Sequence, residues 1–219
     1  MLEKMWAVKE REGWVGLMRR ATKLATRKLR SFPIVREIWV YYKNHQALAT
    51  LTPPVKLHLG CGRVHLDDYV NIDIEDWAGV CDVIASATNL SMFSDNSVEH
   101  ILNHALLEHI PPWDTLKALR EGYRVLKPGG TIQIEVPDLE RIYEDWLVKG
   151  MLGEDEAINN IFGGFKKPGK AYKAQHHLTG FTFDRLTRMM AQVGFREFAR
   201  LEHETYHHIL VVYARKPMS

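Results

Sequence analysis

Cysteine is scarce in this sequence of 219 residues, which contains only two. Two cysteines cannot build a disulfide framework or a zinc site with four cysteine ligands. The sequence opens without a signal peptide, so we expect a protein of the reducing cytoplasm. Long apolar runs are also missing, because arginine or lysine interrupts each of them short of the roughly 18 residues that a membrane-spanning helix needs. The sequence therefore predicts that the chain does not cross a membrane.

Net charge is also low, at +2, but it is unevenly distributed. Residues 1–50 hold eleven lysines and arginines against four glutamates, a balance of +7, which leaves −5 for residues 51–219. We therefore predict a basic helical extension over residues 1–50 attached to a mildly acidic domain over residues 51–219. A charged fraction of 26% with 10% aromatic residues is typical of a folded globular protein and excludes collagen-like and low-complexity chains.

The basic extension has apolar residues at helical spacing. This pattern predicts an amphipathic helix over residues 3–30 and a second, shorter helix over residues 34–44. Three roles stay open for the extension: a lid on the acidic domain, a helix lying on an anionic membrane surface at the inner face of the membrane, and nucleic-acid binding. We rank nucleic acid last, because the aromatic residues do not form a recognisable reading module. The apolar positions of the first helix are Trp14, Leu17, Met18, Ala21, Leu24 and Ala25.

From residue 55 onward, short β-branched or apolar runs alternate with helical patterns. This alternation predicts a three-layer α/β sheet. Residues 150–180 show no clear period, so we expect an irregular insertion there with at most a short helix. We predict strands near residues 55–59, 69–74, 81–85, 98–103, 131–136, 195–203 and 207–215, and helices near 113–126, 138–148 and 182–193.

The first predicted strand runs into Gly60-Cys61-Gly62. Glycines at the end of a strand let the backbone bend sharply and approach a ligand, although the same pattern also fits a tight turn that needs positive φ. Asp73 closes the next strand, where a carboxylate can accept hydrogen bonds from both hydroxyls of a ribose. Only thirteen residues separate Gly60 from Asp73, instead of about twenty, so we predict a first crossover with a very short helix or none.

Taken together in this order, five segments resemble the class I S-adenosylmethionine-dependent methyltransferases. They more narrowly resemble a group with a short first crossover that is often associated with sugar and surface-glycan pathways. The resemblance covers about residues 55–137 and implies a Rossmann-like, mostly parallel sheet of seven strands with an antiparallel last strand. The segments are Leu57-His-Leu-Gly-Cys-Gly62, Tyr69-Val-Asn-Ile-Asp73, residues 86–97, His104-Ala-Leu-Leu-Glu-His109 and residues 121–130.

The resemblance implies S-adenosylmethionine as the cofactor and assigns residues to it. The glycine turn would face the methionine part, Asp73 the ribose, Ile74 the adenine face and residues 86–88 the adenine edge. Two positions depart from the usual pattern, because His58 and Ser86 stand where many relatives have acids. A hydroxyl at Ser86 can still accept a hydrogen bond, though a weaker one than a carboxylate accepts. The expected cofactor-binding residues are Gly60, Cys61, Gly62, Asp73, Ile74, Ser86, Ala87, Thr88 and His104.

Two histidines are candidates for removing a proton from the acceptor. Methyl transfer depends mainly on alignment of the reacting atoms, and a base is needed only when the acceptor carries a proton of high pKa. His109 follows the fourth strand at the expected cofactor edge, and His177 lies in the insertion. A purely structural role stays open for His109, and His176 stays open as an equivalent of His177.

Residue spacing bears on two further kinds of site, one for a metal and one for an anion. His100 and His104 are four residues apart, which suits a metal on a helix but separates them by roughly 13 Å on the predicted strand, so no metal is predicted. Four lysines in the insertion fit either a solvated loop or a cradle for a phosphate or carboxylate on the acceptor. These lysines are Lys166, Lys167, Lys170 and Lys173.

We therefore predict S-adenosylmethionine-dependent methyl transfer to a sugar or glycan-related acceptor, on oxygen. The acceptor would be a small molecule or a lipid-linked glycan. The alternative is a non-catalytic cofactor- or nucleotide-binding module that docks to a partner or membrane through its basic N-terminal helix.

Overall fold

The computed structural model describes residues 32–76, 79–164 and 176–218. The chain forms two compact units that divide after Thr50. In the first unit the structure describes one helix, α2 (Pro33–Ala49), which begins at a proline and is five residues longer at its end than predicted. The amphipathic helix predicted over residues 3–30 lies outside the described residues. No helix in the described ranges is long and apolar enough to cross a bilayer.

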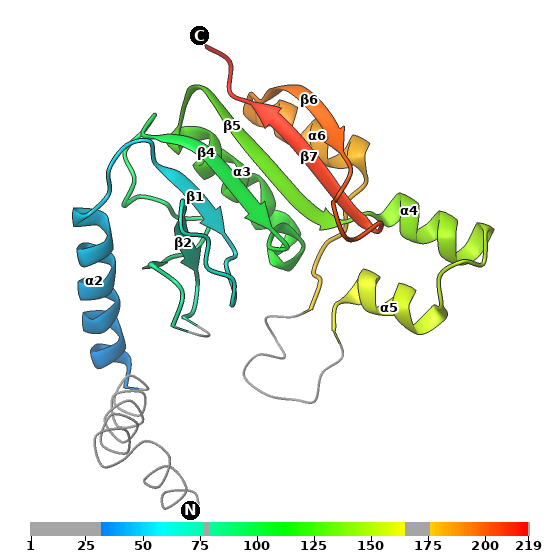
Figure 1. Cartoon of the computed structure of the whole chain (residues 1–219), viewed down its shortest axis with the longest axis horizontal. Helices are drawn as coiled ribbons and strands as arrows, with labels where there is room; N and C mark the ends of the chain where they lie inside the picture. Colours follow the sequence, from blue (N-terminus) through cyan, green and yellow to red (C-terminus); the bar gives the residue numbers. More distant parts are fainter. Residues whose placement is uncertain (1–31, 77–78, 165–175, 219) are drawn as a thin grey trace, which may run out of the picture. The chain divides into compact units, whose positions relative to one another are not determined.

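The second unit is organised around a seven-stranded sheet with the order β3-β2-β1-β4-β5-β7-β6 (Figure 1). Neighbouring strands are parallel except at β7, which is antiparallel to both β5 and β6. The predicted mostly parallel sheet with an antiparallel last strand is thus confirmed. The strands are β1 (Lys56–Leu59), β2 (Val70–Asp73), β3 (Val83–Ile84), β4 (Val98–His104), β5 (Leu126–Pro137), β6 (Arg196–Leu201) and β7 (Ile209–Arg215).

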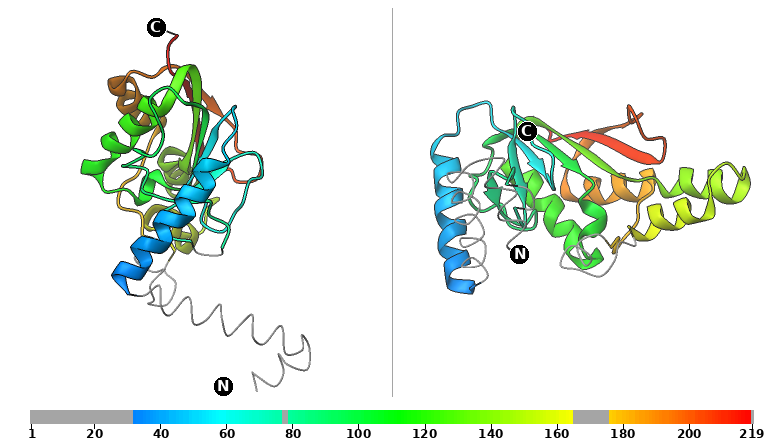
Figure 2. Two further views of the ribbon diagram at one scale, coloured as in Figure 1. Left: turned by 90° about the vertical axis from the view of Figure 1, so that its left-hand side faces the viewer. Right: turned by 60° about the horizontal axis from the view of Figure 1, so that its bottom comes forward.

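The described helices of this unit follow β4 and β5, and two of them pack together. Figure 2 shows α3 and α6 on the same face of the sheet. The Thr182 side chain caps α6 by accepting from the N–H of Arg185, and Gly194 ends it, so the helix lies within the predicted range of residues 182–193. The helices are η1, a 3₁₀ turn (Leu107–His109), α3 (Pro112–Val125), α4 (Leu139–Tyr143), the π-helical η2 (Glu144–Val148), α5 (Glu154–Phe162) and α6 (Phe183–Val193).

The face of the sheet beneath α3 is apolar. Leu57, Ile101 and Ile132 lie side by side in register on β1, β4 and β5, and all are buried. Gly122 of α3 lies so close to this face that a Cβ there would meet the Cδ1 of Ile101 at 3.5 Å. Direct helix–sheet packing therefore forms the main core.

The other face of the same strands carries polar side chains, because side chains alternate along a strand. His58, His104 and Glu135 point there from β1, β4 and β5. Nδ1 of His104 lies 2.6 Å from Oε2 of Glu135, and Nδ1 of His58 lies 3.0 Å from Oδ1 of Asn71 on β2. Directed hydrogen bonds thus organise this face.

The first crossover is a loop, as its short length predicts. Asn71, which is fully buried, fixes the loop to the polar face of the sheet. Its side-chain oxygen accepts from the Leu66 N–H at 2.9 Å, and its nitrogen donates to the Leu66 carbonyl at 3.0 Å and to Oδ2 of Asp82 at 2.9 Å. One buried amide therefore anchors the crossover loop at several points.

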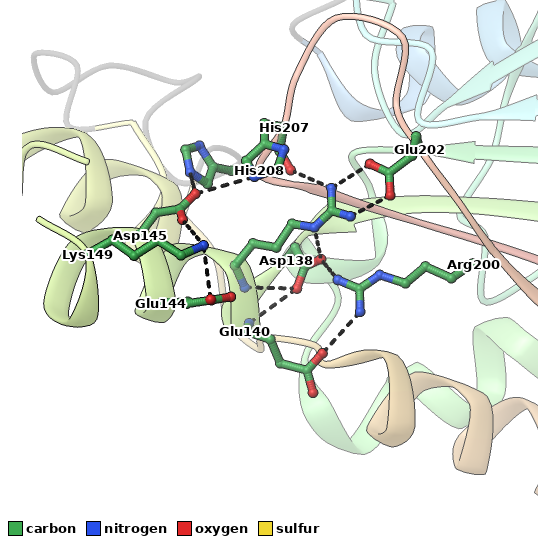
Figure 3. A network of polar contacts seen from close by, with 10 residues as sticks. Asp138, Glu140, Glu144, Asp145, Lys149, Arg200, Glu202, His207 and His208 are labelled. Carbon is green, nitrogen blue, oxygen red and sulfur yellow. Dashed lines mark hydrogen bonds and ion pairs between the residues drawn. The ribbon is translucent and has the colours of Figure 1, made fainter. Parts of the chain in front are cut away.

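The predicted insertion contains the helix α5, which packs with α4 beyond the end of β5 (Figure 1). Ile142, Leu152 and Ala157 form a small buried cluster between them. The polar network in Figure 3 ties this helical region to the turn before β7. In that network, Nε2 of His208 donates to buried Asp145 at 3.0 Å, and the same carboxylate accepts from Lys149 at 3.1 Å.

Candidate functional site

The predicted cofactor residues lie at the carboxyl ends of the parallel strands. β1 is central there, because β2 pairs on one side of it and β4 on the other. The chain thus runs outward in both directions from this point, the position where open α/β sheets bind their ligands. The ends of β1, β2, β3 and β4 carry Gly60–Gly62, Asp73, residues 86–88 and His104, respectively.

The two glycines after β1 have different environments. Gly60 has φ +79°, and a Cβ there would lie 2.7 Å from the Cβ of Leu106 and 3.0 Å from the His104 carbonyl oxygen. Gly62 has φ +52°, but a Cβ would meet nothing closer than the Gly60 carbonyl at 4.0 Å. Gly60 therefore allows close packing against the β4 loop, whereas Gly62 borders open space.

Asp73 supports the glycine turn directly. Its Oδ2 accepts a hydrogen bond from the Gly62 N–H at 2.9 Å. The side chain of Cys61 is buried, and the neighbouring Cys81 thiol together with burial raises the pKa of Cys61. Cys61 therefore fills the interior with its side chain, and the carboxylate of Asp73 remains the polar group of this turn.

The expected adenine-binding positions present one apolar surface and one hydroxyl pair. Ile74 is 51% exposed at the end of β2, which leaves an apolar face uncovered. Oγ of Ser86 lies 2.8 Å from Oγ1 of Thr88, and Ala87 between them is buried. Because Ser86 also accepts from the Thr88 N–H at 3.2 Å, its hydroxyl is already oriented by its own loop.

The side chain of His104 lies on the polar face of the sheet, where its Nδ1 is 2.6 Å from Oε2 of Glu135. Its hydrogen bond with Glu135 outweighs burial and raises the pKa of His104. For Glu135, burial opposes ionisation, but the bonds from His104 and Gln133 hold its pKa below the ordinary value. The backbone carbonyl oxygen of His104 lies next to Gly60, 3.0 Å from where a Cβ of that residue would be. His104 therefore pairs with Glu135 through its side chain and packs next to the glycine turn through its backbone.

The two candidate bases, His109 and His177, come together although they are distant in sequence. Their ring centroids are 4.9 Å apart. Nδ1 of His109 lies 2.9 Å from the carbonyl of His176, and Nδ1 of His177 lies 3.0 Å from the carbonyl of Asn160. Since a carbonyl only accepts, each Nδ1 carries the proton and each Nε2 keeps its lone pair.

Burial favours the neutral form of both rings. It lowers the pKa of His109, with the carboxylate of Asp73 acting in the opposite direction as a smaller influence. It also lowers the pKa of His177, to which the neighbouring His109 contributes. Burial thus favours imidazoles whose Nε2 lone pairs are free of a proton, and His109 lies within electrostatic range of the predicted ribose-binding acid.

Backbone hydrogen bonds hold the two histidines together. The N–H groups of Leu178 and Thr179 donate to the carbonyl of Glu108 at 2.8 and 3.2 Å, and the N–H of His177 donates to the carbonyl of Phe162 at 3.1 Å. The first two bonds fasten the end of the insertion to η1, and the third fastens His177 to the end of α5. The lysine cluster predicted for the same insertion lies outside the described residues.

Glu108 is a site residue that sequence reasoning missed. It is buried, and burial raises its pKa to about 7. The only sequence signal is its place between Leu107 and His109, where an acid reads as an ordinary polar residue of a turn. His100, by contrast, lies away from this group and pairs with Oγ1 of Thr131 at 2.8 Å.

Comparison with protein families places a methyltransferase domain over residues 57–134. The match runs from β1 into β5 and includes the expected cofactor-binding residues. Among curated proteins, the ubiquinone/menaquinone biosynthesis C-methyltransferases UbiE of Brucella canis and Brucella abortus are 38% identical over 60 residues. The aligned part is 25% of this chain and 22% of those proteins, so the likeness spans less than a quarter of their length.

Solved structures share the fold. An S-adenosylmethionine-dependent methyltransferase from Methanosarcina mazei superimposes with a TM-score of 0.51 at 19% identity, over 78% of this chain and 96% of that one. A possible exported protein from Bordetella parapertussis gives a TM-score of 0.53 at 15% identity, over 84% of this chain and 70% of that one. Residues 57–134 therefore match a methyltransferase domain, and the chain shares the fold of a solved S-adenosylmethionine-dependent methyltransferase.

Proposed function

We propose that this protein, on the basis of its methyltransferase domain, methylates an oxygen atom of a sugar or glycan-related acceptor. S-adenosylmethionine supplies an activated methyl group, which becomes bonded to the acceptor oxygen as its bond to sulfur breaks and the electron pair stays on sulfur. A sugar hydroxyl is almost fully protonated at neutral pH, so its proton must also be removed.

The residues at the carboxyl edge of the sheet fit the cofactor. Gly62 leaves open space where a side chain would otherwise stand, and Asp73 offers a carboxylate beside it. Ile74 leaves an apolar surface uncovered for an aromatic ring. The hydroxyl of Ser86 replaces the usual acid at the adenine edge, so we expect a weaker hydrogen bond there than a carboxylate would make.

The single observation that supports oxygen as the methylated atom is the pair of neutral histidines. His109 and His177 are held by backbone carbonyls so that both Nε2 atoms keep their lone pairs. Such nitrogens can take the hydroxyl proton while the oxygen attacks. The sugar or glycan class of acceptor rests on the resemblance of the short first crossover to enzymes of those pathways.

The function is tested by mass spectrometry of sugar nucleotides and lipid-linked glycans incubated with the protein and S-adenosylmethionine. We expect one acceptor class to gain the mass of one methylene group. The His177→Ala variant should lower turnover by about a hundredfold or more, the usual loss when a positioned base is removed. Its affinity for S-adenosylhomocysteine should be unchanged, because His177 is assigned to the acceptor. Unaltered turnover would remove His177 from the mechanism.

We further propose that the acceptor is met at an anionic membrane surface. No residue of α2 is buried, and it exposes several large apolar side chains. The surrounding extension is strongly basic, which favours anionic headgroups. We expect the full chain to sediment with vesicles that contain anionic lipids and a chain lacking residues 1–50 to stay in solution. Absence of sedimentation by the full chain would contradict the proposal. The apolar side chains are Ile34, Val35, Ile38, Tyr41 and Tyr42 of the helix, together with Phe32 just before it.

A further inference from the structure

Three potential metal ligands converge where the end of the insertion meets η1. Each of three residues offers one ligand atom, and these atoms all lie within 4.8 Å of one another. The residues are Glu108, His109 and His177. Two of these residues belong to η1, and the third is held by the hydrogen bond of its own N–H to Phe162. We propose that these three side chains bind a divalent transition-metal ion, with Zn²⁺ as the ion that the ligand set fits.

The donor set has the composition of a catalytic zinc site. Two imidazole nitrogens and one carboxylate bind zinc in such sites, with a further position left open. Bonds of about 2.0–2.2 Å from one ion place its ligand atoms roughly 3–4 Å apart. The spacing of up to 4.8 Å between these atoms therefore requires them to close in by about an ångström when the ion binds.

The hydrogen bonds of the two rings set the tautomer that a metal needs. Nδ1 of His109 donates to the carbonyl of His176, and Nδ1 of His177 donates to the carbonyl of Asn160. Metal-binding histidines almost always donate their second ring N–H to a carbonyl, carboxylate or water in this manner. Each ring is thus fixed in orientation with Nε2 available as a ligand.

The environment of Glu108 is a separate argument for a metal ion at this site. This residue is only 2% exposed, and its Oε2 has no hydrogen-bond partner within the part of the chain that the structure describes. A buried carboxylate oxygen without a partner is costly, and native structures rarely leave one unexplained. An ion shared with His109 and His177 would give this oxygen its partner.

A bound ion would change how the acceptor loses its proton. It would occupy the Nε2 lone pairs and offer its open position to the acceptor hydroxyl, whose pKa would fall on coordination so that its proton could pass to solvent water. The ion would then do the task that the histidines perform without it. This role rests on the proposed function, whereas binding of the ion does not.

Isothermal titration of the metal-free, full-length protein with Zn²⁺ tests the proposal. We expect one ion per chain, and we expect Glu108→Gln and His177→Ala each to weaken binding at least about tenfold. His207→Ala is the matched control, because it removes a histidine that lies 3.4 Å from Asp145, outside the cluster. Its affinity for Zn²⁺ should equal that of the wild type.

The outcomes separate the metal site from the enzyme. Lack of saturable Zn²⁺ binding, an affinity unchanged in both cluster variants, or an equal loss in His207→Ala overturns the site. Circular dichroism checks folding, and His177→Ala decides alone if Glu108→Gln does not fold. S-adenosylhomocysteine is titrated into the same samples. If Zn²⁺ binds and S-adenosylhomocysteine does not, the metal site stands and the methyltransferase proposal is refuted. If S-adenosylhomocysteine binds and Zn²⁺ does not, the metal site is refuted and the methyltransferase proposal stands.

Discussion

The two faces of the central sheet come from the same strands but are held by different forces. Towards α3, residues such as Ile101 and Ile132 are aliphatic and buried under a helix. On the other face, His58 and Asn71 of β1 and β2 are equally buried but bind through directed hydrogen bonds. Aliphatic packing tolerates small changes of shape, whereas a buried polar group demands its partner. The polar face of the sheet should therefore tolerate substitutions less well than the apolar face.

Substitutions of similar size on the two faces give the largest expected contrast. Asn71→Leu keeps most of the volume but leaves the backbone of Leu66 and the ring of His58 without their partner. Since each stranded buried group costs about 1–3 kcal/mol, the loss should be on the order of 3 kcal/mol. Ile101→Val on the apolar face should cost only about 1 kcal/mol. Urea denaturation measures both, and equal losses would break the comparison.

A smaller effect distinguishes two histidines of the polar face by pH. The hydrogen bond with Glu135 raises the pKa of His104, so its contribution is full below the unfolded pKa of 6.5 and is lost as pH rises through the folded pKa. Burial, followed by the charge of Lys56, lowers the pKa of His100, whose contribution is instead lost as pH falls through that region.

Thermal denaturation between pH 5 and pH 9 tests these signs. The advantage of the wild type over His104→Gln should shrink as pH rises, and its advantage over His100→Gln should grow. Both changes should be small, because the His104 side chain is 44% exposed and solvent screens its ion pair. Parallel slopes for the two variants would contradict the assigned environments.

Local signals in the sequence were sufficient for most of the fold. Thr182 and Gly194 bound α6 because a hydroxyl cap and a glycine stop act within one turn. The short distance from Gly60 to Asp73 correctly predicted a crossover without a helix. The sequence predicts this strand only from residue 131, yet β5 already begins at Leu126, because the backbones of Gly129 and Gly130 bond to that of Lys216 beyond β7. That bond joins distant segments, and no local pattern contains it.

The candidate site shows the same limit. Both candidate bases were identified individually, from their positions after a strand and within an insertion. Their contact, and the inclusion of Glu108, depend on backbone bonds from Leu178 and Thr179 to Glu108 of η1, about 70 positions earlier in the chain. The burial that raises the pKa of Glu108 is likewise a property of the assembled fold.

Calorimetric titration with S-adenosylhomocysteine tests the central claim most directly. We expect one site per chain and loss of detectable binding in Asp73→Ala, because this carboxylate supports the Gly62 N–H and is the expected partner of the ribose. Circular dichroism of the variant confirms that it is folded. Absence of binding by the wild type at millimolar ligand would contradict a methyltransferase.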